Sequence, residues 1–315
     1  MNLENDSALK NLQRMEENLG QVIQGKKNEI RLLMIALLAG GHTLLEDVPG
    51  TGKTTLAKSL ARTMDGIFHR IQFTPDLLPA DITGSNFYNP KEGTFTFREG
   101  PIFANIVLAD EINRTSPRTQ SALLEVMSEN QITVAGSRMS LPQPFFVIAT
   151  QNPIEFHGTY PLPEAQLDRF AIRISLGYPN SEQEVNILFS QNDSHPFEKL
   201  NPVVTCAEVL KLQSQIKRVR VDRSVAEFIV QLVESTRKDS RLRIGISPRG
   251  SLTLYRTAQA RAFLEGRDYV LPEDVTALAA PVLAHRILMD TKARYSGHLA
   301  SQIIEEILAA VPVPR

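Results

Sequence analysis

The sequence predicts an α/β fold with a mostly parallel sheet, followed by a helical second part. Three observations support this: short apolar runs alternate with helical patterns up to about residue 180, a glycine-rich turn follows the first run, and helical periodicity dominates afterwards. The apolar run before Asp110 does not alternate with polar residues, as expected for a strand buried on both faces. The expected strands are residues 42–48, 69–73, 105–111, 145–150 and 171–176, and the helices between them include 53–64 and 119–128.

The second part is expected to form a helical domain of its own. Residues 222–239 carry apolar side chains at helical spacing, and further helices are expected at 247–265, 272–288 and 298–310. The turn at 177–180 marks the boundary. We therefore expect two domains, 1–180 and 181–315, which agrees with a chain of 315 residues.

Composition excludes several classes of protein. The 34 basic and 35 acidic residues leave a formal net charge of −1, which argues against a surface built to grip nucleic acid. The single cysteine, Cys206, excludes an internal disulfide and an all-cysteine metal site. The longest apolar stretch, residues 30–39, is too short to cross a bilayer, and the N-terminus lacks a signal-peptide pattern. We expect a cytoplasmic protein without membrane insertion.

One block departs from this balance. Residues 211–249 contain ten basic and four acidic residues. A solvated helical face explains such a run, and a surface that faces an anion or a neighbouring subunit is the alternative.

A phosphate-binding loop is predicted between the first strand and the next helix, where residues 42–58 read HTLLEDVPGTGKTTLAK. Glycines let the backbone N–H groups point at phosphate oxygens, and the helix directs its positive end to the same place. A lysine here can reach the β- and γ-phosphates, and a threonine can ligate Mg²⁺. The strict motif requires glycine at position 47, which is Asp47. The expected nucleotide-binding residues are Pro49, Gly50, Thr51, Gly52, Lys53, Thr54 and Thr55, with Thr54 also a metal ligand.

An acidic pair follows 57 residues after Lys53, where Asp110 ends a buried strand and Glu111 comes next. Two carboxylates in this position are costly unless a cation faces them. Asp110 can hold Mg²⁺ through its water shell, and Glu111 can polarise the attacking water as general base. A chance acidic pair is the alternative, and the phosphate loop upstream disfavours it.

Residues 93–136 and 144–170 closely resemble the MoxR family of AAA+ ATPases, and the resemblance extends over about residues 15–310. It implies a P-loop AAA+ core with a parallel five-stranded sheet of order 5-1-4-3-2, plus an all-α lid. It also implies ATP and Mg²⁺ as cofactors, and a nucleotide site between the subunits of a ring, usually a hexamer. Proteins of this family act as chaperone-like factors, with client proteins that carry von Willebrand A domains.

The resemblance also assigns roles to single residues. Asn152 matches sensor 1, which orients the attacking water. Arg169 matches the arginine finger offered to a neighbouring site, with an ion pair to Asp168 or another acid as the alternative. Arg249 matches sensor 2, which touches the γ-phosphate, with a plain surface arginine as the alternative. The segment beside adenine matches Val22, Ile23, Gln24 and Gly25, although a simple turn before a helix explains these four almost as well.

Two further segments match elements that face the pore in related rings. Residues 74–103 resemble the helix-2 insert, and residues 130–144 are expected to form a β-hairpin. Exposed loops without function are the alternative. The expected function is hydrolysis of ATP to ADP and phosphate, coupled to chaperone-like remodelling of client proteins. A nucleotide-dependent scaffold or switch with negligible turnover, a DNA-acting AAA+ motor and a magnesium-chelatase-like subunit are the other hypotheses. Nucleic acid is disfavoured mainly by the family resemblance, and only weakly by the balanced charge.

Overall fold

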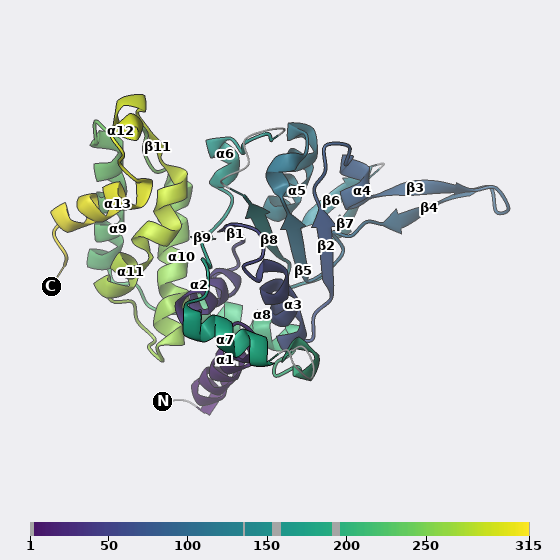
Figure 1. The fold of residues 1–315 in the computed structure, drawn as a ribbon, viewed down its shortest axis with the longest axis horizontal. Coiled ribbons are helices and arrows are strands. Elements are labelled where there is room, and N and C mark those ends of the chain that lie inside the picture. Colours follow the sequence, from purple (N-terminus) through teal and green to yellow (C-terminus); the bar gives the residue numbers. More distant parts are fainter. Residues whose placement is uncertain (1–2, 135, 153–158, 191–195, 315) are drawn as a thin grey trace.

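The computed structural model describes residues 3–314 apart from 135, 153–158 and 191–195. Five parallel strands form the central sheet, in the order β2-β5-β8-β1-β9 (Figure 1). Read from the other edge, this is the predicted order 5-1-4-3-2, so the predicted fold is confirmed. The strands are β1 (Thr43–Glu46), β2 (Phe68–Gln72), β5 (Ile106–Asp110), β8 (Phe146–Gln151) and β9 (Ile172–Ile174).

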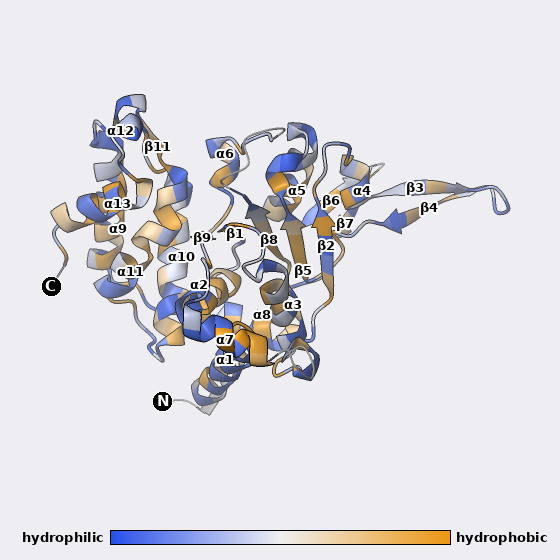
Figure 2. Cartoon of the chain, viewed as in Figure 1, coloured by the Kyte–Doolittle hydropathy of each residue, from blue (hydrophilic) through white to orange (hydrophobic). Residues whose placement is uncertain are grey.

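Successive side chains of a strand point to opposite sides of the sheet, so an apolar run supplies apolar residues to both faces. Both faces of the central strands are therefore covered by packed side chains. Leu108 and Ile148 belong to one apolar cluster, whereas their neighbours Val107 and Val147 belong to the other. All five residues of β5 are buried. This explains why the runs in the sequence are apolar without alternation. Figure 2 shows β5 and β8 as hydrophobic segments, whereas the edge strand β2 is partly hydrophilic.

Four longer helices flank the sheet: α1 (Leu3–Val22), α2 (Lys27–Leu38), α3 (Lys53–Thr63) and α5 (Pro117–Glu129). α3 and α5 agree with the predicted helices, whereas α1 and α2 were not predicted. α1 packs against α2 and α3. Its side chains Leu12, Met15 and Leu19 are completely or almost completely buried. Helices α1 and α2 are therefore part of the packed first part of the molecule.

Two hairpins extend the core. Residues 74–103 contain the short helix α4 (Pro79–Thr83) and the hairpin β3 (Gly84–Asn89) and β4 (Thr94–Glu99), which projects far from the sheet (Figure 1). The predicted hairpin at 130–144 is present as β6 (Gln131–Val134) and β7 (Ser137–Ser140).

The second part contains seven α-helices among the described residues, together with a small sheet. The prediction of an all-α lid is therefore wrong in detail: β10 (Leu242–Ile244) pairs antiparallel with β11 (Leu288–Met289). The predicted helix 272–288 ends at Leu283 and is followed by a short 3-10 helix, Ala284–Arg286, where the Arg286 side chain donates to the carbonyl groups of Val282 and Phe170. The helices are α7 (Ser181–Ser190), α8 (Cys206–Ile216), α9 (Arg223–Lys238), α10 (Pro248–Leu264), α11 (Pro272–Leu283), α12 (Thr291–Tyr295) and α13 (Ala300–Ala310).

The larger apolar cluster crosses the predicted domain boundary. It joins Leu33 and Leu60 of the first part to Val209 and Phe228 of the second. The boundary at residue 180 therefore separates two patterns of secondary structure, while packing continues across it, and it stays a prediction. Among the described helices, none has the length and apolar character needed to cross a membrane.

Candidate nucleotide-binding site

One pocket of about 400 Å³ collects most of the predicted catalytic and phosphate-binding residues. It lies at the carboxyl ends of β1, β5 and β8, which meet at one edge because the strands are parallel. The polypeptide thus brings together segments that are about 100 residues apart in the sequence. The lining residues are Pro49, Gly50, Gly52, Lys53, Thr54, Thr55, Arg70, Asp110, Glu111, Thr150 and Asn152.

The loop before α3 has the backbone geometry of an anion-binding turn. Gly50 and Gly52 have φ of 86° and 90°, in the left-handed region that favours glycine. Gly52 caps α3, so the first N–H groups of that helix face the pocket without helical partners. A Cβ at Gly50 would meet nothing within 4 Å, which shows open space beside the loop. The N–H groups and the helix N-terminus therefore suit a phosphate group chemically. Thr51 lies between the two glycines, and its hydroxyl donates to the carbonyl of Val48 at 3.3 Å.

Asp47, which departs from the strict motif, has a structural role. Its Oδ2 accepts the backbone N–H groups of Leu176 at 2.6 Å and Gly177 at 2.8 Å. Its Oδ1 accepts the N–H of Val48 at 3.0 Å. The carboxylate thereby ties the start of the loop to the chain that leaves β9, so the loop is held without a glycine at position 47.

Lys53 lies over the loop that it closes, and its Nζ donates to the carbonyl oxygens of Asp47 at 2.8 Å and Val48 at 3.1 Å. For Lys53→Ala we predict that ATP affinity falls about 100-fold, because one charged hydrogen-bond donor to phosphate is lost. The fold is retained, since the side chain contacts no apolar core. Calorimetric titration with ATP measures the change, and Lys58→Ala on the exposed side of α3 is the control. An affinity within threefold of wild type contradicts the assignment.

Asp110 and Glu111 are held by residues that the sequence did not single out. Asp110 Oδ1 accepts the Thr150 hydroxyl at 2.5 Å, and Oδ2 accepts the Arg70 guanidinium. The Thr150 oxygen also accepts the N–H of Glu111 at 2.8 Å. Glu111 has φ of 57°, and this left-handed turn follows directly on the end of β5. The buried amide Asn152 lines the same pocket at the end of β8.

The oxygen donors in the pocket suit Mg²⁺. Thr54 and Asp110 line the same pocket and offer a hydroxyl and a carboxylate, and hard cations prefer oxygen ligands. Magnesium binds few protein groups and keeps several waters, so two protein ligands beside phosphate oxygens are sufficient. Among the residues that the structure describes, no group of three or more histidine, cysteine, aspartate or glutamate side chains has metal-binding geometry.

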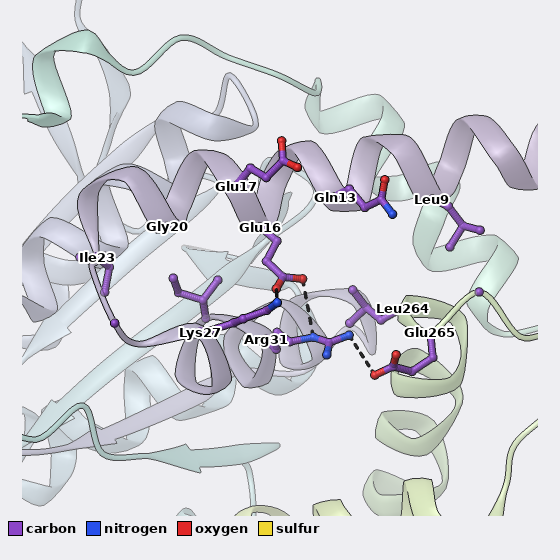
Figure 3. A pocket seen from close by; sticks show the side chains of 13 residues that line it. Leu9, Gln13, Glu16, Glu17, Gly20, Ile23, Lys27, Arg31, Leu264 and Glu265 are labelled. Carbon is purple, nitrogen blue, oxygen red and sulfur yellow. Dashed lines mark ion pairs between the residues drawn. The ribbon is translucent and has the colours of Figure 1, made fainter.

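The segment predicted to lie beside adenine is adjacent to the loop but faces a second pocket. Ile23 Cδ1 lies 4.0 Å from the position that a Cβ on Gly52 would take. Ile23 and Gly25 line a pocket of about 720 Å³ between α1, α2 and the end of α10 (Figure 3). Val22 packs against the apolar cluster. The role of these residues and of Gln24 at adenine stays a prediction.

This second pocket is crossed by ion pairs that join the two parts of the chain. Glu16 pairs with Lys27 and Arg31, each at 3.6 Å, and Arg31 also pairs with Glu265 at 2.9 Å (Figure 3). Most of the charged side chains that line this second pocket therefore form ion pairs with one another.

Arg169 and Arg249 lie together, away from Lys53. They line a third pocket, of about 240 Å³, with Arg256 and His42. Burial lowers the pKa of His42 to about 4, so this ring is neutral near pH 7. None of the described residues that line the pocket is acidic. The structure therefore does not bring Arg249 to the phosphate loop of its own chain, and it creates a positive pocket that suits an anion.

Arg169 takes its partners from α5. Its Nη1 donates to the carbonyl of Leu124 and to the Ser128 hydroxyl. Asp168 is instead bound by Arg286 and by the Ser247 hydroxyl, the latter at 3.0 Å. The alternative of an ion pair between Arg169 and Asp168 is therefore wrong in this structure.

The basic block at 211–249 contains several exposed ion pairs. Arg223 pairs with Glu227 at 2.8 Å and Lys238 with Glu234 at 3.6 Å, one helical turn apart on α9. Arg249 lies at the other end of the block and lines the positive pocket. Part of the block is therefore a solvated helical face, as the simpler interpretation expects.

Comparison with known proteins connects this geometry to a group of ATPases. Residues 42–172 match the model of the ATPase family associated with various cellular activities (AAA), and residues 234–307 match the AAA lid domain. The chain is 51% identical over 298 residues to the uncharacterized protein YeaC of Bacillus subtilis, covering 95% of this chain and 93% of the relative. It is 39% identical over 313 residues to Chaperone MoxR1 of Mycobacterium tuberculosis, covering 96% and 82%.

A solved structure gives the same result. A protein of Cytophaga hutchinsonii that is assigned as an ATPase superimposes with a TM-score of 0.91 at 41% identity, covering 99% of this chain and 97% of that one. The similarity extends over both parts of the chain, so the relative arrangement of sheet and helices is shared.

Proposed function

The chain belongs to the MoxR family of AAA+ ATPases, and we propose that it hydrolyses ATP to ADP and phosphate at the pocket that contains Lys53. One observation carries this proposal: the phosphate loop, both acidic residues and Asn152 line a single pocket. The loop and Lys53 bind the phosphates. Thr54 and Asp110 would hold Mg²⁺, which neutralises charge on the phosphates.

Glu111 and Asn152 are positioned to act on the attacking water. A carboxylate accepts the proton of that water, and a carboxamide orients it. In the structure Glu111 Oε2 accepts from Gln72 at 2.8 Å and from Arg114 at 3.0 Å. These bonds hold the carboxylate at the edge of the pocket through its Oε2.

The two arginines matched to the arginine finger and to sensor 2 lie outside the pocket of Lys53, which supports assembly into a ring. Phosphoryl transfer gains from an additional positive group, yet Arg169 and Arg249 lie in a different pocket. We propose that both arginines reach the ATP of the neighbouring subunit, with a hexamer as the expected ring. A pocket with three arginines and a neutral histidine suits the negative charge of a neighbour's γ-phosphate.

We further propose that the ATP cycle remodels client proteins in the cytosol, with clients that carry von Willebrand A domains. The projecting hairpin supports this, because Phe87, Tyr88 and Phe95 on it are each more than half exposed. Exposed aromatic side chains on a protruding element are typical of contact surfaces. Tyr88 and Phe95 face each other across the two strands, with ring centroids 5.3 Å apart.

A scaffold or switch with negligible turnover is the second candidate. Steady-state phosphate release by wild type and by Glu111→Gln separates the two. We predict about 100-fold slower release in the variant, with ATP still bound, because the general base is lost. Glu129→Gln at the exposed end of α5 is the control. Equal rates in wild type and Glu111→Gln would contradict hydrolysis by this mechanism, and the ATP-bound variant is the form to use for capturing a client.

A further inference from the structure

We propose that Arg70 competes with Mg²⁺ for the Asp110 carboxylate and thereby sets the metal concentration at which the ATP site fills. The inference rests on the proposed function, since it concerns the same metal. Arg70 lies on β2, the edge strand beside β5, and its side chain reaches into the pocket of Lys53. Two of its nitrogens, Nε and Nη2, donate to Asp110 Oδ2 at 3.0 and 2.6 Å.

A count of lone pairs shows why the two cations compete. An ionised carboxylate has about four acceptor sites, two on each oxygen. Both sites on Asp110 Oδ2 are used by Arg70, and the Thr150 hydroxyl uses one on Oδ1. One acceptor site is left for a metal-bound water. Departure of Arg70 frees two more on Oδ2, so Asp110 can offer both of its oxygens to the metal and its waters only when Arg70 has left.

Arg70 has room to leave. Its side chain is 47% exposed, whereas that of Asp110 is 12% exposed. The pocket that it lines is the one that would hold the phosphates, so its guanidinium can exchange the carboxylate for a phosphate oxygen while its charge stays paired. A guanidinium that stays on Asp110 would instead lie close to a divalent ion of the same sign.

Movement of Arg70 away from Asp110 would also affect Glu111. Arg70 Nη2 donates to Gln72 Oε1 at 2.7 Å, and Gln72 Nε2 donates to Glu111 Oε2 at 2.8 Å. Arg70 and Gln72 are two residues apart on one strand, so both side chains point to the same face. When Arg70 moves, Gln72 loses the partner that fixes its amide. Arg70 therefore links the filling of the metal position to the freedom of the proposed general base.

The test uses Mn²⁺ as a spectroscopic substitute for Mg²⁺. The full-length protein is loaded with a non-hydrolysable ATP analogue, with protein in excess over nucleotide, and free Mn²⁺ is measured by electron paramagnetic resonance during a titration. For Arg70→Gln we predict that the free Mn²⁺ concentration at half-saturation falls about three- to fivefold. This is the size expected for loss of a partly exposed ion pair. Arg70→Met, which keeps the aliphatic stem, shows the same shift, and Arg70→Lys, which keeps the charge, stays within twofold of wild type.

Arg173→Gln is the matched control. Arg173 pairs with Glu46 at 3.0 Å across neighbouring strands of the same sheet, without contact to Asp110. The Arg173→Gln variant is expected to leave the Mn²⁺ concentration at half-saturation unchanged. The inference is overturned if Arg70→Gln and Arg70→Met bind Mn²⁺ as wild type does or more weakly, or if Arg173→Gln shifts equally. A wild type that takes up no Mn²⁺ with bound analogue contradicts the metal site itself, which separates failure of the proposed function from failure of this inference.

Discussion

Arg169→Ala is expected to bind ATP with wild-type affinity and to hydrolyse it about 10³-fold more slowly. Binding is spared because Arg169 does not line the pocket of Lys53 in its own chain. In the ring that we propose, turnover is lost because the arginine assigned to neutralise transition-state charge in the next subunit is missing. Calorimetry for binding and phosphate release for turnover are the two measurements, and Arg118→Ala on the exposed start of α5 is the control.

A mixing experiment tests whether Arg169 acts between subunits. Lys53→Ala retains Arg169 but cannot hold ATP, whereas Arg169→Ala holds ATP but lacks the arginine. Mixed rings contain interfaces where an intact loop meets an intact arginine, so part of the activity returns although each variant alone is inactive. Mixtures that are no more active than the variants alone contradict the role of Arg169 in a neighbouring site.

Arg286→Met is expected to lower the free energy of unfolding by about 3 kcal/mol, because it leaves a largely buried carboxylate without its cation. The Arg286 side chain is 1% exposed and contacts the Asp168 carboxylate. It also donates to the carbonyls of Asp168 at 2.7 Å, Phe170 at 2.5 Å and Val282 at 2.7 Å. Urea unfolding at fixed protein concentration measures the loss.

A double variant separates the ion pair from general loss of packing. In Asp168→Asn combined with Arg286→Met no charge is left unpaired, so the double variant is expected to be more stable than Arg286→Met alone. Arg223→Met, which removes an exposed pair on α9, is the control and changes stability by less than about 0.5 kcal/mol. A double variant no more stable than Arg286→Met would show that the unpaired carboxylate does not cause the loss and that packing dominates.

Local signals explain what could be predicted from the sequence. Strands such as β5 and β8 are short apolar runs, and the loop before α3 is defined by neighbouring residues, so both could be found without knowing the sheet. α1 was missed because it is mostly polar and only one of its faces packs on α2 and α3. β10 and β11 were missed because strands of three and two residues gain their hydrogen bonds only from each other, across more than 40 residues of chain.

The residues around the acidic pair depend on pairing between strands. Gln72 lies opposite Asp110 in the register of β2 and β5, and Arg70 lies two residues earlier on the same face. Polar residues at alternate positions of an edge strand are common, so the sequence alone could not separate Arg70 from any exposed arginine. The position of Arg249 likewise depends on how α10 docks against the core, which no local pattern encodes.

The contacts that hold Asp168 affect how Arg169 and Arg249 can move. Ser247 and Arg286, both from the lid, hold the residue immediately before Arg169, and Arg249 follows Ser247 by two positions. The backbone that carries Arg169 is therefore fastened to the lid that carries Arg249, whereas the Arg169 side chain itself is bonded to α5 of the core. In a ring, a tilting lid would move Arg249 directly and would pull on the backbone of Arg169 through Asp168. The two proposed contacts to the next ATP would then respond to the same lid movement.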